Sequence, residues 1–397
     1  MRFKRLIIAA LSMLPGLGFA QTTVSLDEGY YRVQNSYNSR YLALLDNTGY
    51  AKRNGASIDA DLYALRSLND TNKIMSNPAT IVHLSKGSTG YVCSAQGTST
   101  KDITSYEMTL QNYSGGIVIS VEVGSYGKTI LTEYDYTTPD KFDANDKLIS
   151  RGKTLPDSGL VNQTGASSKS RRIYWKFEKI DASTSNYVGF APALSLGGKY
   201  YDTFYAEFPF KVVSDGVTVY SVYTIYDGKA VLKPFAADDI IPGGTPVVVE
   251  CSSKDDSSNK IQPLLTTASA LSQNQLKGVY FNYYCDQVST KIHDNRTKYD
   301  ASKMRVLGVS DGKLAFINAT NLTYLPANKA YLSVPVGTGD VVGVMSYSDY
   351  VAAGINGVTI DKNDSKSGIY TLGGQKTSKV AKSGLYIING QKVVVKK

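Results

Sequence analysis

The sequence predicts an all-β protein built of sandwiches or barrels. Short runs of alternating polar and apolar residues follow one another along most of the chain, and Gly, Ser and Asn separate them. Tyrosine is abundant, with 30 residues among 397, and aromatic side chains fit the half-buried surface of a strand. Apolar residues at the spacing of an amphipathic helix are rare. Regular turns between short strands are typical of β-sandwiches and β-barrels.

The first 20 residues have the pattern of an export signal. Three basic residues precede an apolar segment at residues 6–14, and small residues precede the expected cleavage between Ala20 and Gln21. The apolar segment is shorter than the ~20 residues that span a bilayer. No later stretch is apolar enough to do so, and we expect no transmembrane helix. The sequence therefore predicts a protein that is secreted or held at the outer cell surface.

Three regions follow the signal, and they differ in their strand pattern. The first contains three strand–turn–strand segments that begin near Gly29, Thr80 and Glu107, and the strand around Trp175 is expected to close it. The second has longer continuous β runs, and the third is a thin segment that ends in a hairpin. The expected domains are residues 1–20 (signal), 21–185, 186–337 and 338–397.

Only three segments are candidates for helices. They are residues 57–69, 264–278 and 346–355, and each shows some apolar periodicity at helical spacing. Ser57 is a candidate cap for the first, and Asp349 lies early in the last.

The cysteines are too few for a disulfide scaffold. Cys251 and Cys285 fall in one expected domain and are candidates for a disulfide in an oxidising compartment. Cys93 lies in an alternating segment, and we expect it to be a small buried apolar side chain.

The net charge of +9, from 43 basic and 34 acidic residues, is small for this length. The basic residues are scattered, whereas nucleic-acid binding requires a basic cluster on a recognisable module. We therefore expect no nucleic-acid partner.

Three segments of the chain resemble known families. Residues 29–44, GYYRVQNSYNSRYLAL, resemble the opening strands of ricin-type β-trefoil lectin repeats, and the resemblance extends over residues 29–177. It implies a β-trefoil-like fold. The Gln-x-Trp signature of those lectins is absent, so the resemblance does not extend to their sugar site. Residues 200–251 and 306–335 resemble a β-sandwich-like accessory module of secreted proteins of the Bacteroides and Prevotella group.

The carboxy-terminal segment 368–397 is similar to the final strands of type IX secretion sorting domains. The residues that carry this resemblance are Gly384, Tyr386, Asn389, Gly390 and Lys392. Asn389 and Gly390 also form a two-residue hairpin signal, since both tolerate positive φ. The resemblance implies either an export label or a structural cap.

Two loops combine aromatic residues with polar neighbours, as a sugar-binding surface requires. One contains Asp46, Asn47 and Tyr50, and the other contains Tyr134 and Tyr136. Binding residues are often placed on loops that a rigid scaffold supports.

The sequence offers little for catalysis. A dyad of Cys285 and His293 is conceivable, but no family signature surrounds it. Glutamates are scarce and lie on alternating strands, whereas glycoside hydrolysis requires two acids across a cleft. We expect no enzyme, no metal and no cofactor.

The expected function is adhesion or carbohydrate binding by an exported, non-enzymatic protein, with a glycan or a surface or host protein as its partner. One alternative is a protein-binding accessory component or a trefoil that acts as a protease inhibitor, and another is a hydrolase with an unrecognised site. The discriminating features are exposed aromatics with polar neighbours for sugar binding, and an apolar patch or protruding loop for protein binding.

Overall fold

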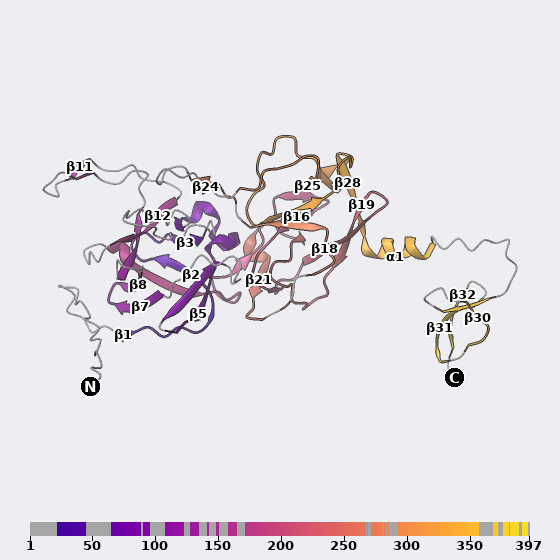
Figure 1. Ribbon diagram of the computed structural model, residues 1–397, viewed down its shortest axis with the longest axis horizontal. Helices are drawn as coiled ribbons and strands as arrows, with labels where there is room; N and C mark the ends of the chain where they lie inside the picture. Colours follow the sequence, from indigo (N-terminus) through magenta and orange to yellow (C-terminus); the bar gives the residue numbers. More distant parts are fainter. Residues whose placement is uncertain are drawn as a thin grey trace, which may run out of the picture. The chain divides into compact units, whose positions relative to one another are not determined.

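The structure is a computed structural model of the chain. The residues that it describes are 22–44, 65–88, 90–95, 108–122, 128–134, 141–142, 148–150, 158–164, 171–266, 268, 271–280, 282, 284–285, 293–294, 296–356, 368–371, 376–380, 382–388 and 391–395. The chain divides into two compact units, Met1–Met345 and Ser346–Lys397. The predicted all-β class is confirmed, because the described chain is built mainly of strands in several sheets, with one short α-helix (Figure 1).

The first unit contains two lobes, and the first lobe is built on an eleven-stranded sheet. Its strands are β1 (Thr22–Thr23), β2 (Gly29–Asn35), β3 (Tyr41–Leu44), β4 (Leu65–Leu68), β5 (Val82–Lys86), β6 (Tyr91–Ala95), β7 (Met108–Tyr113), β8 (Gly116–Glu122), β9 (Lys128–Tyr134), β12 (Ser158–Thr164) and β13 (Tyr174–Lys179). Strands β10 (Lys141–Phe142) and β11 (Leu148–Ser150) pair with each other. The described part of the lobe also contains the 3-10 turns η1 (Asp70–Asn72), η2 (Ile74–Ser76), η3 (Pro78–Thr80) and η6 (Arg171–Ile173).

Six of these strands close into a ring. The order is β2, β5, β6, β7, β8 and β13, and β13 closes the ring because it pairs with both β8 and β2. All of the pairs are antiparallel. The second and third predicted strand–turn–strand segments supply two ring strands each, the first supplies β2 while its second strand, β3, lies outside the ring, and the strand of Trp175 closes the ring. The equivalence of the three segments, which a β-trefoil requires, stays a prediction.

The ring encloses the first apolar core. Trp175 is fully buried there, and its Nε1 donates a hydrogen bond to the carbonyl oxygen of Leu131 at 3.2 Å. Cys93 is buried in the same core, as predicted. Successive side chains of a strand point to opposite faces, so strands β2 and β13 each direct one set of side chains into the ring and the other set out of it.

The second lobe contains a ten-stranded and a three-stranded sheet. The larger sheet has the order β15 (Leu194–Leu196), β16 (Lys199–Phe204), β20 (Val247–Cys251), β18 (Val217–Tyr226), β19 (Lys229–Pro234), β28 (Val341–Ser346), β26 (Lys313–Ile317), β25 (Met304–Ser310), β27 (Lys329–Ser333) and β22 (Leu276–Val279). The smaller sheet contains β14 (Val188–Gly189), β21 (Lys260–Pro263) and β17 (Phe210–Val212), and a 3-10 turn, η7 (Asp256–Ser258), precedes β21. Strands β23 (Tyr284–Cys285) and β24 (His293–Asp294) form a separate pair.

The ten-stranded sheet folds on itself so that its two halves pack face to face. One apolar cluster joins Val222 and Val248 from the first half to Phe316, Leu332 and Val342 from the second half. Strand β28 pairs with β26, and the first compact unit ends at Met345, past the expected boundary at residue 337.

A second cluster of buried residues is shared by the two lobes. It contains Tyr30 and Ile81 from the first lobe and Phe190, Phe208 and Ile261 from the second lobe. The rings of Tyr30 and Phe208 lie 5.6 Å apart. Burial of this apolar surface is the main stabilising contribution to the contact between the lobes.

Two of the three expected helices are wrong where the structure describes them. Leu65–Leu68 is strand β4, and Leu276–Val279 is strand β22. The third, α1 (Tyr347–Asn356), is confirmed. Ser346 caps it, because its Oγ accepts a hydrogen bond from the Asp349 amide at 3.1 Å.

The second unit contains α1 and a four-stranded sheet, drawn in yellow in Figure 1. The order of the sheet is β30 (Lys376–Thr377), β29 (Ile369–Thr371), β31 (Gly384–Ile388) and β32 (Gln391–Val395). Strands β31 and β32 are antiparallel with Ile388 opposite Gln391, which is the register that a two-residue connection at 389–390 requires.

Candidate functional site

Most of the residues that the sequence singled out for binding or processing lie outside the described residues. These are Ala20, Gln21, Asp46, Asn47, Tyr50, Tyr136, Asn389 and Gly390. Tyr134 ends strand β9 and Lys392 lies in β32, and only their backbone is described. Gly384 begins β31, and the Tyr386 hydroxyl donates to the carbonyl oxygen of Lys382 at 3.1 Å.

The expected disulfide between Cys251 and Cys285 is not formed. Cys251 is a free thiol that is fully buried in the cluster shared by the two lobes. Burial is the main cause that raises the pKa of this thiol to about 12, and the nearby carboxylates of Asp202 and Glu250 contribute to the same rise. Cys285 lies instead in the short pair β23–β24, where the register places it opposite His293. The side chains of these two residues lie outside the description.

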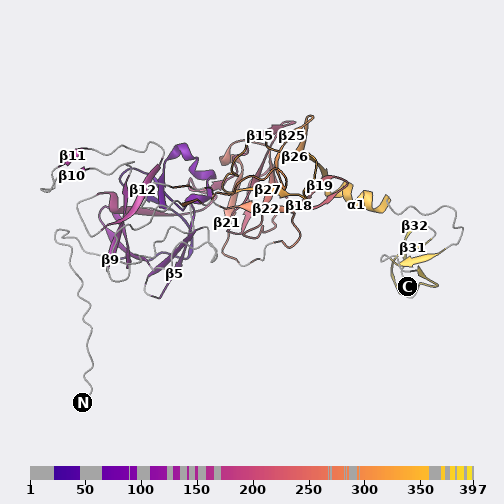
Figure 2. The same cartoon turned by 45° about the horizontal axis from the view of Figure 1, so that its top comes forward.

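A pocket of about 350 Å³ lies between the two halves of the ten-stranded sheet. Strands β15 and β16 form one wall, and β25, β27 and the loop before β27 form the other. Figure 2 shows β15 beside β25 at the top of the lobe. The volume lies near the lower end of the ~300–1,000 Å³ range of ligand pockets. Most of the lining is aliphatic, and it includes Leu194, Val279, Val306, Leu307, Leu322 and Leu325.

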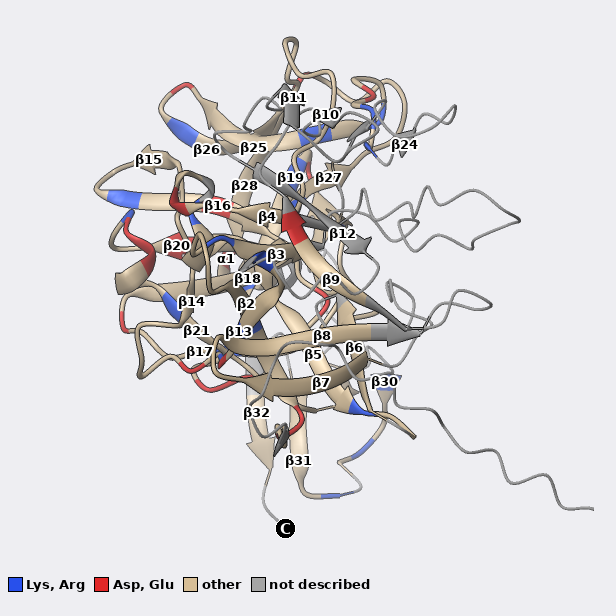
Figure 3. Cartoon of the chain, turned by 90° about the vertical axis from the view of Figure 1, so that its left-hand side faces the viewer, with Lys and Arg blue, Asp and Glu red and all other residues tan. Residues whose placement is uncertain are grey.

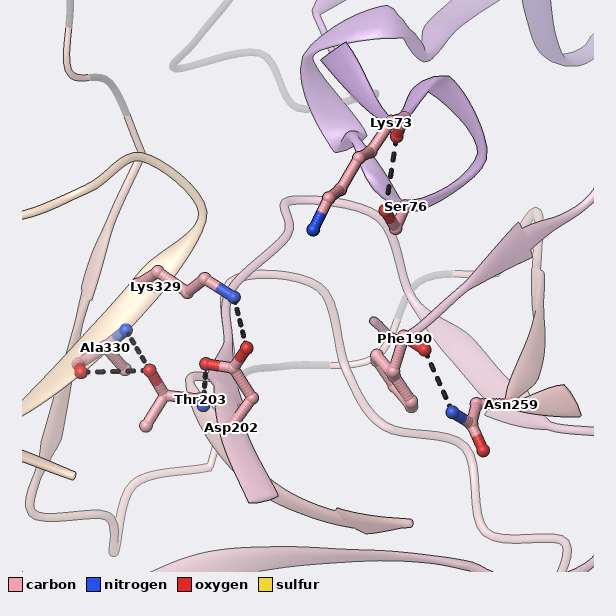
Figure 4. A network of polar contacts seen from close by, with 8 residues as sticks. All are labelled: Lys73, Ser76, Phe190, Asp202, Thr203, Asn259, Lys329 and Ala330. Atoms are coloured by element: carbon pink, nitrogen blue, oxygen red, sulfur yellow. Dashed lines mark hydrogen bonds and ion pairs between the residues drawn. The ribbon is translucent and has the colours of Figure 1, made fainter. Parts of the chain in front are cut away.

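An ion pair stands at the pocket (Figure 4). The Nζ of Lys329, on β27, lies 2.7 Å from Oδ2 of Asp202, on β16, and both side chains are partly exposed. The neighbouring residues Thr203 and Ala330 connect the same two strands, because the Thr203 hydroxyl accepts from the Ala330 amide at 3.0 Å. These contacts hold the two walls together and fix the width of the pocket at this end.

A cluster of tyrosines and charged residues continues from the pocket wall. Glu250, on β20, lies opposite Tyr201 in the register, accepts a hydrogen bond from the Tyr220 hydroxyl at 3.2 Å and lies 3.7 Å from Nζ of Lys199. Burial and the Glu250 carboxylate raise the pKa of Tyr220 to about 12, and they raise that of Tyr201 above its ordinary value. Both phenols are therefore neutral hydrogen-bond donors at physiological pH.

The pocket has the composition of a binding site. Its charged groups are the Asp202–Lys329 pair, and its remaining surface is mostly alkyl. No group of three or more His, Cys, Asp and Glu side chains that could hold a metal ion occurs among the described residues. An apolar pocket with a few polar groups at its border favours an apolar group of a ligand, and the polar groups orient that ligand.

Arg32 joins the two lobes, a role that no local pattern in the sequence indicates. Its side chain is fully buried and donates five hydrogen bonds to neutral oxygens. Two of the acceptors, Asn186 Oδ1 at 2.8 Å and the Tyr187 carbonyl at 2.6 Å, belong to the segment that enters the second lobe. Burial lowers the pKa of Arg32 to about 10, so it remains charged at neutral pH.

An exposed aromatic residue lies on the first lobe. Tyr37, in the turn between β2 and β3, is 53% exposed, and the Arg172 guanidinium lies 4.6 Å from its ring centre. Arg172 is itself held by the fully buried carboxylate of Glu133 at 2.8 Å. The ring is therefore supported on one face, as in an aromatic platform for a sugar ring.

No family model and no curated protein matches this chain. The resemblances in the sequence therefore stay predictions. None of the helices in the part of the chain that the structure describes has the length and apolar character to cross a membrane. Lys and Arg are interspersed with Asp and Glu over the strands of the first unit (Figure 3).

Proposed function

We propose that this chain is an exported, non-enzymatic protein that binds a partner protein outside the cell or at its surface. The export signal and the sorting-like tail support the location. The observation that carries the binding proposal is the aliphatic pocket with the Asp202–Lys329 pair at its border. A pocket of about 350 Å³ suits one or two apolar side chains of a partner.

Adhesion through carbohydrate is the second candidate function, and Tyr37 favours it. Its ring is 53% exposed and lies against Arg172, so one face is supported while the side chain remains accessible. Tyr134 ends strand β9 of the same lobe, and the predicted site residue Tyr50 lies outside the described residues. A β-trefoil-like first lobe and an adhesive role are consistent with the resemblances in the sequence.

One parallel screen tests these proposals. The purified protein is applied to a glycan array and to an array of extracellular and cell-surface proteins, together with Ala193→Trp and Tyr37→Ala variants. Ala193 is exposed and lines the pocket, so a Trp there obstructs the pocket without replacing a core residue. Tyr50→Ala and Tyr134→Ala variants test the other aromatic residues.

Binding to a specific protein that Ala193→Trp abolishes and Tyr37→Ala preserves supports the proposal. Binding to a glycan that Tyr37→Ala, Tyr50→Ala or Tyr134→Ala abolishes supports the second candidate instead. Binding to neither array contradicts both.

A further inference from the structure

The pocket adjoins an open edge of the ten-stranded sheet. Strand β15 is the last strand at this end, and its only partner among the described strands is β16. An edge strand presents a row of backbone N–H and C=O groups that can pair with another extended chain. Figure 3 shows the hairpin of β15 and β16 at the border of the lobe.

The hairpin geometry determines which residue points its backbone groups outward. Gly197 and Gly198 form a two-residue turn with φ of 59° and 77°, and such turns require positive φ at both positions. The flanking pair, Leu196 and Lys199, is then the hydrogen-bonded one, and the pattern alternates along an antiparallel pair. Ser195, opposite Tyr200, therefore directs its N–H and C=O away from β16.

The side chains of an added strand would meet the pocket. Leu194 lines the pocket from β15, and its cross-strand partner Tyr201 lines it from β16. A strand that pairs with β15 places alternate side chains on the same face as Leu194. One of these side chains stands beside the aliphatic lining, so the open edge and the pocket can bind a single extended segment.

The charges around the pocket indicate a neutral, apolar segment. Lys329 is paired with Asp202 at 2.7 Å, and Lys199 lies 3.7 Å from Glu250. Positive and negative groups are thus matched within the site. A charged side chain that entered the pocket would lose its hydration and gain no net counter-charge, whereas a branched aliphatic side chain would lose no polar contact.

We infer that this protein recognises its partner by strand addition. An extended, uncharged segment of the partner pairs with the outer edge of β15 and inserts a Val, Ile or Leu side chain into the pocket. In this mode of recognition, the backbone hydrogen bonds supply affinity and the pocket supplies specificity. The inference rests on the proposed protein-binding function and specifies its mode.

The test uses the purified full protein and a library of random 12-residue peptides displayed on phage. A selected peptide is synthesised with a fluorophore, and its dissociation constant is measured by fluorescence anisotropy. Ser195→Pro removes the outward N–H and leaves the bonds between β15 and β16 intact, because edge strands tolerate proline there. Ser195→Thr is the matched control, and Ala193→Trp obstructs the pocket.

We expect selected peptides to share a branched aliphatic residue within an uncharged extended sequence. Ser195→Pro should weaken binding roughly tenfold, since each backbone hydrogen bond contributes modestly and the ring also obstructs the edge. Ala193→Trp should abolish binding, and Ser195→Thr should bind normally. Circular dichroism spectra of all variants check that they are folded.

Three results would overturn the inference in distinguishable ways. If Ala193→Trp abolishes binding while Ser195→Pro has no effect, the pocket binds the partner without strand addition, and the proposed function survives. If no peptide is selected, or neither variant affects binding, the pocket is not a peptide site and the proposed function fails as well. Self-association that Ser195→Pro abolishes, with no peptide bound, identifies a second copy of this chain as the occupant and overturns the assignment to a partner protein.

Discussion

Replacement of Arg32 with Met should destabilise the contact between the two lobes of the first unit. The guanidinium donates five hydrogen bonds to neutral oxygens, and Met removes every donor while it keeps an unbranched, flexible apolar stem. The acceptors include the carbonyl oxygens of Ile74, which begins the turn η2, and of Met75, which lies within it. Buried acceptors without a donor destabilise the folded protein, because water donates hydrogen bonds to them in the unfolded state.

The magnitude follows from two opposing contributions. Hydrogen bonds to a charged group contribute ~1.5–3 kcal/mol each, although such contributions are not additive. Desolvation of the cation acts in the opposite direction, and it lowers the pKa of Arg32 to about 10. We expect a net loss of ~3–5 kcal/mol, which is the usual effect of removing one side of a buried charged network.

Urea denaturation, followed by the fluorescence of Trp175 and by far-UV circular dichroism, measures this loss. The midpoint should fall by about 1 M or more, since m values of ~1–3 kcal/mol/M are typical. Lys176→Met, at an exposed position of β13, is the matched control and should change stability by less than ~0.5 kcal/mol. An Arg32→Met protein as stable as the control would show that desolvation cancels the hydrogen bonds, and would refute the role given to Arg32.

Three further predictions concern buried groups. Cys251 has its pKa raised to about 12, so it should resist iodoacetamide at pH 8 in the folded protein and react after unfolding. Peptide mapping by mass spectrometry would measure the alkylation, and rapid alkylation of the folded protein would contradict the burial of Cys251. Three tyrosines have pKa values raised from the ordinary 10.0 to about 12: Tyr30, Tyr187 and Tyr220. The folded protein favours their neutral form, so their contribution to stability is present below pH 10 and is lost as the pH rises through about 12. A spectrophotometric titration should show these phenols ionising late, and normal ionisation of all tyrosines would contradict this. Trp175, which is fully buried, should show blue-shifted emission and weak quenching by acrylamide, and strong quenching would contradict the closed first core.

The local pattern was sufficient for the strands of the closed ring. In residues 29–35 the apolar and polar positions alternate, and strand β2 follows them. Helix α1 was also predictable, because Ser346 and Asp349 stand where an amino-terminal cap requires them. These features depend on residues that are close in the sequence.

Features that depend on distant partners were not predictable. Leu65 and Leu68 have a spacing that fits a helix, but pairing with β3 and β12 makes this segment a strand. The pocket combines residues near 194–203 with residues near 306–330, and no local signal connects them. Arg32 resembles a solvent-facing strand residue in the sequence, and only the contact with the second lobe buries it.

Methyl NMR of protein labelled at Leu and Val would show directly whether a peptide binds at the pocket of the second lobe. A peptide selected by phage display would be titrated into the labelled protein, and shift changes would be mapped onto the assigned methyl groups. Binding at the pocket predicts changes concentrated at Leu194, Val306 and Leu307. Changes concentrated instead at Leu42 and Leu131, in the core of the first lobe, would contradict it and would place the binding site on the first lobe.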